Sequence, residues 1–343
     1  MNVMAEIEVA CPMCGDINAV DSDYGSAVCQ SCGAVFAVPE MNEEPTVYNE
    51  RSAVEFDIRS GVLEAYGGSG PVAMVPAGVT AIGGQAFKEC EGLRRVILPE
   101  GVTEIQSSGE GMWGAFFGCR SLETVELPST LVRIGSNAFN GCTKLANIDL
   151  PDSVTNIGPG AFCGCTALAS VKLSKGLRDL PNDIFRSCVS LTDIKLNGNI
   201  KTIGNNAFAD CCNIRAFSIP PGIKTIGSFA FSGCTGLTDI TLPATLVSLG
   251  ASAFSDCRNL CSINIPAAVE FETDGSGVRT FAGCSALKDV IIGKLPDNFA
   301  EIFAATPWLE IYLVKQGRCR HCGGNFKGVF KKVCEVCGLP KDY

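Results

Sequence analysis

Apolar residues recur with a fixed period through the middle of the chain. The 23-residue unit reads L-x-x-I-x-L-P-x-x-V-x-x-I-G-x-x-A-F-x-x-C-x-x. Its L-x-x-I-x-L part predicts a short strand with one apolar face, which the following proline ends. The I-G pair predicts a second inward contact and a tight bend, and Ala, Phe and Cys are expected to enter the interior. One unit cannot bury this face alone, so stacking into a repeat solenoid with a parallel sheet is expected.

The columns of this repeat carry a family resemblance. Cysteines follow the 23-residue spacing without exception from Cys119 to Cys257, and longer intervals separate this run from Cys90 before it and Cys284 after it. A phenylalanine precedes each of them by three residues, and Leu or Ile follows by three. The signature I-G-x-x-A-F-x-x-C-x-x-L resembles the BspA-like type of leucine-rich repeat over residues 53–314. This resemblance implies a leucine-rich-repeat right-handed superhelix with a curved parallel β-sheet, and many members of that family look like surface or adhesion proteins.

Both ends of the solenoid carry capping signals. In residues 54–68 the apolar residues Val54, Phe56 and Ile58 alternate with polar ones, which predicts a hairpin cap. After Cys284 a degenerate unit keeps the phase with Phe303, Thr306 and Leu309, and residues 309–314 are predicted to close the stack as a strand.

Two breaks in the period mark candidate binding loops. Six extra residues precede Phe116 and four precede Phe281, at the same phase of the repeat, so both loops are expected to leave the same face. Met112 and Trp113 in the first loop, with Asp274 and Arg279 in the second, are the candidate partner-binding residues. Tolerated loop growth is the alternative. The outward strand positions are mostly small and polar, which predicts a solvated sheet face; a broad, weak protein-binding surface is the alternative.

Two pairs of C-x-x-C-G motifs flank the repeats. The two-residue spacing lets both thiolates of a motif point at one ion, and two motifs complete a closed tetrahedral site. Both segments resemble zinc ribbons, which implies two structural Zn²⁺ sites. Iron would accept the same ligands, and redox-active dithiols are a third interpretation. The predicted ligands are Cys11, Cys14, Cys29, Cys32, Cys319, Cys322, Cys334 and Cys337.

These motifs divide the chain into four parts. We expect an N-terminal zinc ribbon at residues 1–38, an acidic linker at 39–52, the solenoid at 53–314 and a C-terminal zinc ribbon at 315–343. The column cysteines lie close enough for disulfides, but repetition at a core position favours small buried thiols. Cys261 follows an inward leucine and is the best candidate for a reactive free thiol.

Charge is uneven along the chain. Residues 1–50 carry nine acidic residues and no Lys or Arg, whereas residues 315–343 carry seven basic and two acidic residues, within a net charge of −9. The basic tail interleaves Phe326 and Phe330 with lysines, a pattern that can bind single-stranded nucleic acid. A miniature ribbon core is the alternative role for these two aromatic residues.

These observations favour a binding protein over an enzyme. The single histidine, His321, lies within a cysteine motif, and several families of catalytic site need more than one imidazole. We expect a non-catalytic, monomeric protein–protein interaction scaffold with structural zinc ribbons and a protein partner. A surface adhesion protein and a nucleic-acid adaptor acting through the basic ribbon are the alternatives. The chain has no signal-peptide pattern and no apolar run of membrane-spanning length, so a cytoplasmic location without membrane contact is expected.

Overall fold

The computed structural model divides the chain into two compact units, residues 1–53 and 54–343. In the first unit it describes only four strands. In the second it describes residues 55–109, 112–215, 217–272, 279–320, 323–327, 333–337 and 339.

The first unit contains two antiparallel strand pairs. β1 (Glu6–Ala10) pairs with β2 (Ile17–Asp21), and β3 (Ser26–Val28) pairs with β4 (Val35–Ala37). Each pair therefore brackets one of the two N-terminal C-x-x-C motifs in the segment that joins its strands. The four cysteines of these motifs lie outside the described residues.

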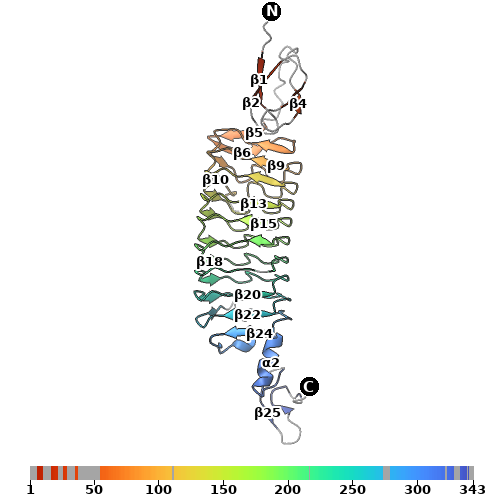
Figure 1. Ribbon diagram of the computed structural model, residues 1–343, viewed down its shortest axis with the longest axis vertical. Coiled ribbons are helices and arrows are strands. Elements are labelled where there is room, and N and C mark those ends of the chain that lie inside the picture. Colours follow the sequence, from red (N-terminus) through yellow and green to blue (C-terminus); the bar gives the residue numbers. More distant parts are fainter. Residues whose placement is uncertain are drawn as a thin grey trace, which may run out of the picture. The chain divides into compact units, whose positions relative to one another are not determined.

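The second unit is a parallel β-solenoid whose turns stack in chain order (Figure 1). The L-x-x-I-x-L segments form the first strand column, in which successive turns pair in parallel, as Ile148 does with Val171. Its strands are β7 (Val72–Met74), β9 (Arg95–Ile97), β11 (Thr124–Glu126), β13 (Asn147–Asp149), β15 (Ser170–Lys172), β17 (Asp193–Ile194), β20 (Asp239–Thr241), β22 (Ser262–Ile265) and β24 (Asp289–Ile292).

The V-x-x-I-G segments form a second strand column, where the sequence predicted only an inward contact and a bend. This column begins with the hairpin of β5 and β6, and its other strands pair in parallel. Its strands are β5 (Phe56–Arg59), β6 (Val62–Tyr66), β8 (Ala81–Ile82), β10 (Glu104–Ile105), β12 (Arg133–Ile134), β14 (Asn156–Ile157), β16 (Asp179–Leu180), β18 (Thr202–Ile203), β19 (Thr225–Ile226), β21 (Ser248–Leu249) and β23 (Glu270–Phe271).

The column phenylalanines form one continuous stack through the core. Neighbouring rings from Phe87 to Phe303 lie 4.8 to 5.7 Å apart, centroid to centroid, and within 24° of parallel. Tyr66 covers the first ring at 5.0 Å and Trp308 covers the last at 4.4 Å. Each turn therefore buries the aromatic face that its neighbour exposes, which is why the turns are stable only as a stack.

The column cysteines are free thiols and, after the first, fully buried. Each buried thiol also donates a hydrogen bond to the phenylalanine carbonyl of the preceding turn, as Cys142 does to Phe116 at 3.2 Å and Cys165 does to Phe139 at 3.1 Å. Small buried thiols were predicted, and this is confirmed. The structure adds that the thiol proton also links successive turns.

The glycine of the I-G pair is needed for a close approach between turns. A Cβ at Gly158 would lie 2.3 Å from the backbone nitrogen of Ser136. The Gly158 N–H donates to the Ile134 carbonyl at 2.8 Å, and Gly204 repeats this bond to Leu180 at 2.9 Å. Pro181 occupies the same position between them and has no N–H to donate. The second strand column is accordingly interrupted between β14 and β16.

The C-terminal cap is helical, and the strand predicted at residues 309–314 is wrong. After the short helix α1 (Phe299–Ile302), α2 spans Pro307–Lys315, with Thr306 as its N-cap accepting the Leu309 N–H at 3.3 Å. Pro at the first helical position and a capping Thr before it favour a helix start. Leu309 and Leu313 lie one helical turn apart and are both buried. A last strand pair, β25 (Phe326–Lys327) and β26 (Val333–Cys334), follows.

No helix in the described residues is long and apolar enough to cross a bilayer.

Candidate functional site

Three of the four predicted C-terminal ligands come together. The sulfur atoms of Cys319, Cys334 and Cys337 lie within 4.8 Å of one another, and those of Cys319 and Cys337 are 3.6 Å apart. Cys319 and Cys334 are buried and Cys337 is exposed. The fourth predicted ligand, Cys322, and the neighbouring His321 lie outside the described residues.

One backbone amide donates to a sulfur atom of this cluster, and a second backbone hydrogen bond closes the turn beside it. The Val336 N–H donates to the Cys334 sulfur at 3.4 Å, and the turn is closed by Gly323 N–H donating to the Cys319 carbonyl at 2.8 Å. A Cβ at Gly324 would lie 2.9 Å from the Cys334 sulfur, so this position requires glycine. Three convergent thiols with an amide donor to sulfur are a donor set that could hold a thiophilic metal ion.

The N-terminal ligands Cys11, Cys14, Cys29 and Cys32 remain a prediction, because they lie outside the described residues. In the basic tail, Phe326 is half-buried and Lys327 is exposed, whereas Phe330 is outside the described residues.

The described residues on the two sides of the first insertion are joined to each other. An isolated bridge joins Ser107 to Gly114, and the Ser108 N–H donates to the Trp113 carbonyl at 2.8 Å. The Trp113 ring meets Phe117 edge-on at 4.6 Å, and the Lys88 ammonium lies 4.0 Å from its centroid. The Trp113 side chain is therefore fixed by contacts with other residues of the solenoid.

Met112 is the large apolar residue that is exposed among the described residues of this loop, with 56 % of its surface accessible to solvent. A flexible, polarizable methionine side chain suits contact with a partner surface. In the second insertion Asp274 lies outside the described residues, and Arg279 is exposed. The two loops are seven turns apart, which is about 34 Å at the spacing of neighbouring strands.

The outward face of the first strand column is polar, as predicted. Arg95 and Glu126 form an ion pair across β9 and β11, and Asp149 and Lys172 are register partners on β13 and β15. These surface pairs are screened by solvent and contribute little to stability.

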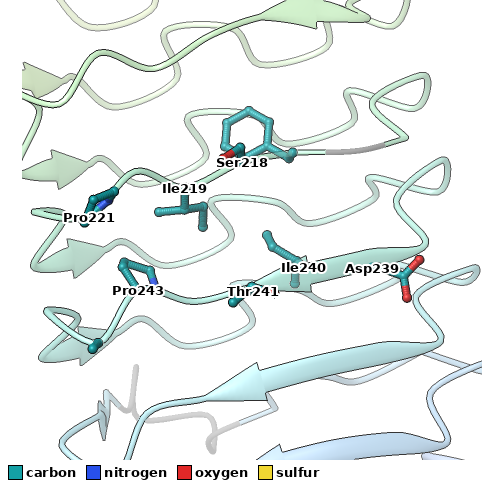
Figure 2. Close-up of a pocket in the computed structure, with 9 residues that line it drawn as sticks. Ser218, Ile219, Pro221, Asp239, Ile240, Thr241 and Pro243 are labelled. Atoms are coloured by element: carbon teal, nitrogen blue, oxygen red, sulfur yellow. The ribbon is translucent and has the colours of Figure 1, made fainter.

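A hollow that the repeat pattern does not predict interrupts this face between β17 and β20 (Figure 2). Its volume is about 520 Å³, and Ile219, Ile240 and two prolines form much of its wall. Phe217 occupies the inward position that holds Val or Ile in the other turns from β9 onward, and its ring meets Phe208 and Phe231 edge-on at 5.0 and 5.1 Å. This larger side chain in the isoleucine column was the sequence signal for an irregular turn.

Few side chains that line the hollow could take part in catalysis. Its one ionisable lining residue is Asp239, whose pKa is lowered because the Ser262 hydroxyl donates to its carboxylate at 2.6 Å. A lone exposed carboxylate without a neighbouring acid, base or nucleophile does not make an active site.

Comparison with known proteins agrees with the repeat architecture. The model of the BspA type leucine rich repeat region matches residues 73–109, 113–215 and 201–315, in six copies. A leucine-rich repeat protein from Bacteroides ovatus is 26 % identical, with 86 % of this chain and 71 % of that one covered and a TM-score of 0.61. The leucine rich repeat protein of T. pallidum is 31 % identical, with 60 % and 86 % covered and a TM-score of 0.45. No curated protein matches the chain.

Proposed function

The chain belongs to the BspA-type leucine-rich repeat family, and we propose that it is a non-catalytic scaffold that binds a protein partner through its insertion loops. The observation that carries this proposal is the first loop, which breaks the period of the repeat and exposes Met112 next to Trp113, whose ring packs against Phe117 and Lys88. An exposed side chain next to a residue that is already held in place can act as an anchor, because less conformational entropy is lost on binding. The separation of about 34 Å between the loops, at the spacing of stacked strands, favours a macromolecule over a small ligand as the partner.

A pull-down from an extract of the source cells tests the scaffold. The full chain is compared with Met112→Asp and with the matched control Val247→Asp, which changes another exposed apolar residue, 50 % exposed, on the same solenoid. We expect one protein to be retained by the wild type and the control and reduced at least tenfold with Met112→Asp. Identical capture by all three proteins would remove the loop from the binding surface.

We infer further that the cysteine motifs at both ends hold structural zinc. The support is the C-terminal donor set of Cys319, Cys334 and Cys337, which fits a closed thiolate site and leaves one position for Cys322. A segment this short cannot bury enough apolar surface to fold alone, so a metal would supply the missing stability.

Metal content tests this inference. We expect about two zinc ions per chain by mass spectrometry of the purified protein, with Cys337→Ser losing one equivalent and Cys29→Ser losing the other. Fewer than one zinc ion per wild-type chain would refute the inference that the two pairs of cysteine motifs are zinc ribbons. Visible absorption bands typical of a ferric thiolate site would show that the bound metal is iron and not zinc.

A further inference from the structure

Cys90 and Cys119 occupy equivalent positions in the first two turns of the cysteine column. The backbone fixes this register, because the Glu89 N–H donates to the Phe117 carbonyl at 2.8 Å. The column phenylalanine rings of the same two turns lie 4.8 Å apart, centroid to centroid. This is the spacing of paired strands, and a disulfide can join cysteines whose Cα atoms lie about 4.4–6.8 Å apart.

The side chains of the two cysteines also meet. The Cys90 N–H and the Cys119 thiol both donate to the carbonyl of Phe87, at 3.2 and 2.8 Å. The Cys119 thiol also forms a hydrogen bond with the sulfur of Cys90. The two sulfur atoms are therefore neighbours across the boundary between the turns.

Cys90 is the more reactive thiol of this pair. It is half-buried, whereas all later cysteines of the column are buried. The hydrogen bond from Cys119 lowers the pKa of Cys90, and the same bond, followed by burial, raises the pKa of Cys119. Cys90 therefore ionises first, and the thiolate is the nucleophilic form of cysteine.

The opposite end of the column provides a matched pair without access to solvent. Cys257 and Cys284 share the same kind of hydrogen bond between their side chains. Both are 0 % exposed, and Thr306, which takes the next position in the column, is buried as well. No column cysteine precedes Cys90 in the sequence. The two pairs therefore have the same contact but differ in exposure.

Cys261, which the sequence favours as the reactive thiol, is exposed but has a different environment. Its N–H donates to the Thr238 carbonyl at 2.8 Å, and its carbonyl accepts from the Lys288 N–H at 3.0 Å. Neither of these residues in the adjacent turns carries a thiol. Exposure alone therefore does not give Cys261 the second sulfur that Cys90 has.

We propose that Cys90 and Cys119 form an oxidation site for peroxides, in which Cys90 reacts first and Cys119 converts the product into a disulfide between turns. The half-buried position of Cys90 favours a small oxidant such as hydrogen peroxide. This site is independent of the proposed binding of a protein partner.

The reaction has two steps. The Cys90 thiolate attacks one oxygen of hydrogen peroxide, the O–O bond breaks, and the released hydroxide takes up the proton that Cys90 had lost and leaves as water. Cys90 is then a sulfenic acid. The Cys119 sulfur attacks the Cys90 sulfur, the S–O bond breaks, and the hydroxide leaves with the Cys119 proton as a second water. The two sulfur atoms together lose two electrons, which the peroxide gains.

The disulfide would enclose the turn that carries the first insertion. Met112 and Trp113 lie between the two cysteines in the sequence. A disulfide restricts the freedom of the chain segment that it closes when that segment unfolds. Oxidation would therefore constrain the turn that exposes Met112.

Peptide mapping of the oxidised full chain tests the proposal. The folded protein is treated with hydrogen peroxide, its remaining thiols are blocked with N-ethylmaleimide during denaturation, and it is digested with trypsin without reduction. The expected product joins residues 89–94 to residues 96–120, whereas the buried reference pair would join residues 280–288 to residues 225–258. We expect the first product to exceed the second by roughly tenfold or more, because oxidation follows exposure and thiolate character.

Three variants separate the roles of the two thiols. Cys90→Ser should abolish the crosslink, and Cys119→Ser should leave a sulfenic acid at Cys90 that dimedone labels. The control Cys163→Ser, which changes a half-buried cysteine outside the column, should leave the crosslink unchanged. Circular dichroism verifies that each variant is folded.

Three results would overturn the proposal. The first is a folded, peroxide-treated wild type without the crosslink between Cys90 and Cys119. The second is an equal yield from Cys257 and Cys284, which would show that exposure of Cys90 has no role. The third is a folded Cys119→Ser variant that dimedone does not label at Cys90.

Discussion

Raising the pH should unfold the solenoid by ionising its buried thiols. Burial raises the pKa of Cys142, Cys165, Cys188, Cys211 and Cys234. The pKa values of Cys119 and Cys257 are raised first by hydrogen bonds with the thiols of Cys90 and Cys284, and then by burial. Ionising any of these seven thiols would bury a charge and remove the proton donated to a carbonyl of the preceding turn.

The size of the effect follows from linkage between protonation and folding. Each folded thiol has a higher pKa than the unfolded thiol, so its contribution to stability is complete below about pH 8.5 and is lost as the pH rises. One unit above the unfolded pKa, each thiol loses about 1.4 kcal/mol, and seven thiols lose about 10 kcal/mol. This is about the whole stability of a typical domain, so unfolding is expected near pH 9.5 to 10.

Urea unfolding followed by circular dichroism, in reducing buffer between pH 7 and 10, measures this dependence. Cys188→Ala should reduce the loss between pH 7.5 and 9.5 by about 1.4 kcal/mol, because one titrating thiol is removed. The control Cys261→Ala, which removes an exposed thiol, should leave the dependence unchanged. A urea midpoint that stays constant from pH 8 to pH 10 would refute the reasoning.

Three substitutions test the core and its irregular positions by urea unfolding at pH 7. Phe162→Ala removes one ring from the stack and should lower the free energy of unfolding by about 3–5 kcal/mol; a loss below about 1 kcal/mol would contradict the role of the stack. Phe229→Asn should raise stability by about 1 kcal/mol, because Phe229 has a φ of 58° where equivalent turns use Asn137 and Asn206; a loss would show that its ring contributes more than its backbone conformation costs. Thr280→Ala should also stabilise by about 1 kcal/mol, since the buried Thr280 hydroxyl has no hydrogen-bond partner in the structure as described; equal stability would indicate a bound water.

The repeat can be predicted from the sequence because the same inward positions recur in every turn. The 23-residue spacing, the inward phenylalanines and the buried cysteines all follow from one unit burying its apolar face on an identical neighbour. The same logic placed Phe303 in the stack, and the structure finds it 5.0 Å from Phe281.

The C-terminal cap shows where this logic fails. The apolar phase of the repeat predicts a final strand at residues 309–314, but the last turn has no following turn to pair with. Thr306 and Pro307 favour a helix start, and a helix lets Trp308, Leu309 and Leu313 cover the open end.

The sequence by itself determined the repeat, its core columns, its solenoid class and the cysteine motifs, because each depends on residues within one unit or one short motif. Tertiary structure decided what depends on contact between turns. The second strand column, its interruption at Pro181 and the hollow beside Phe217 all depend on such contacts. The packing of Lys88 and Phe117 against Trp113 depends on them too. Stacking also decided that β7 and β24 lie at the two ends of the first strand column, because the position of a strand in a sheet depends on which strands pair.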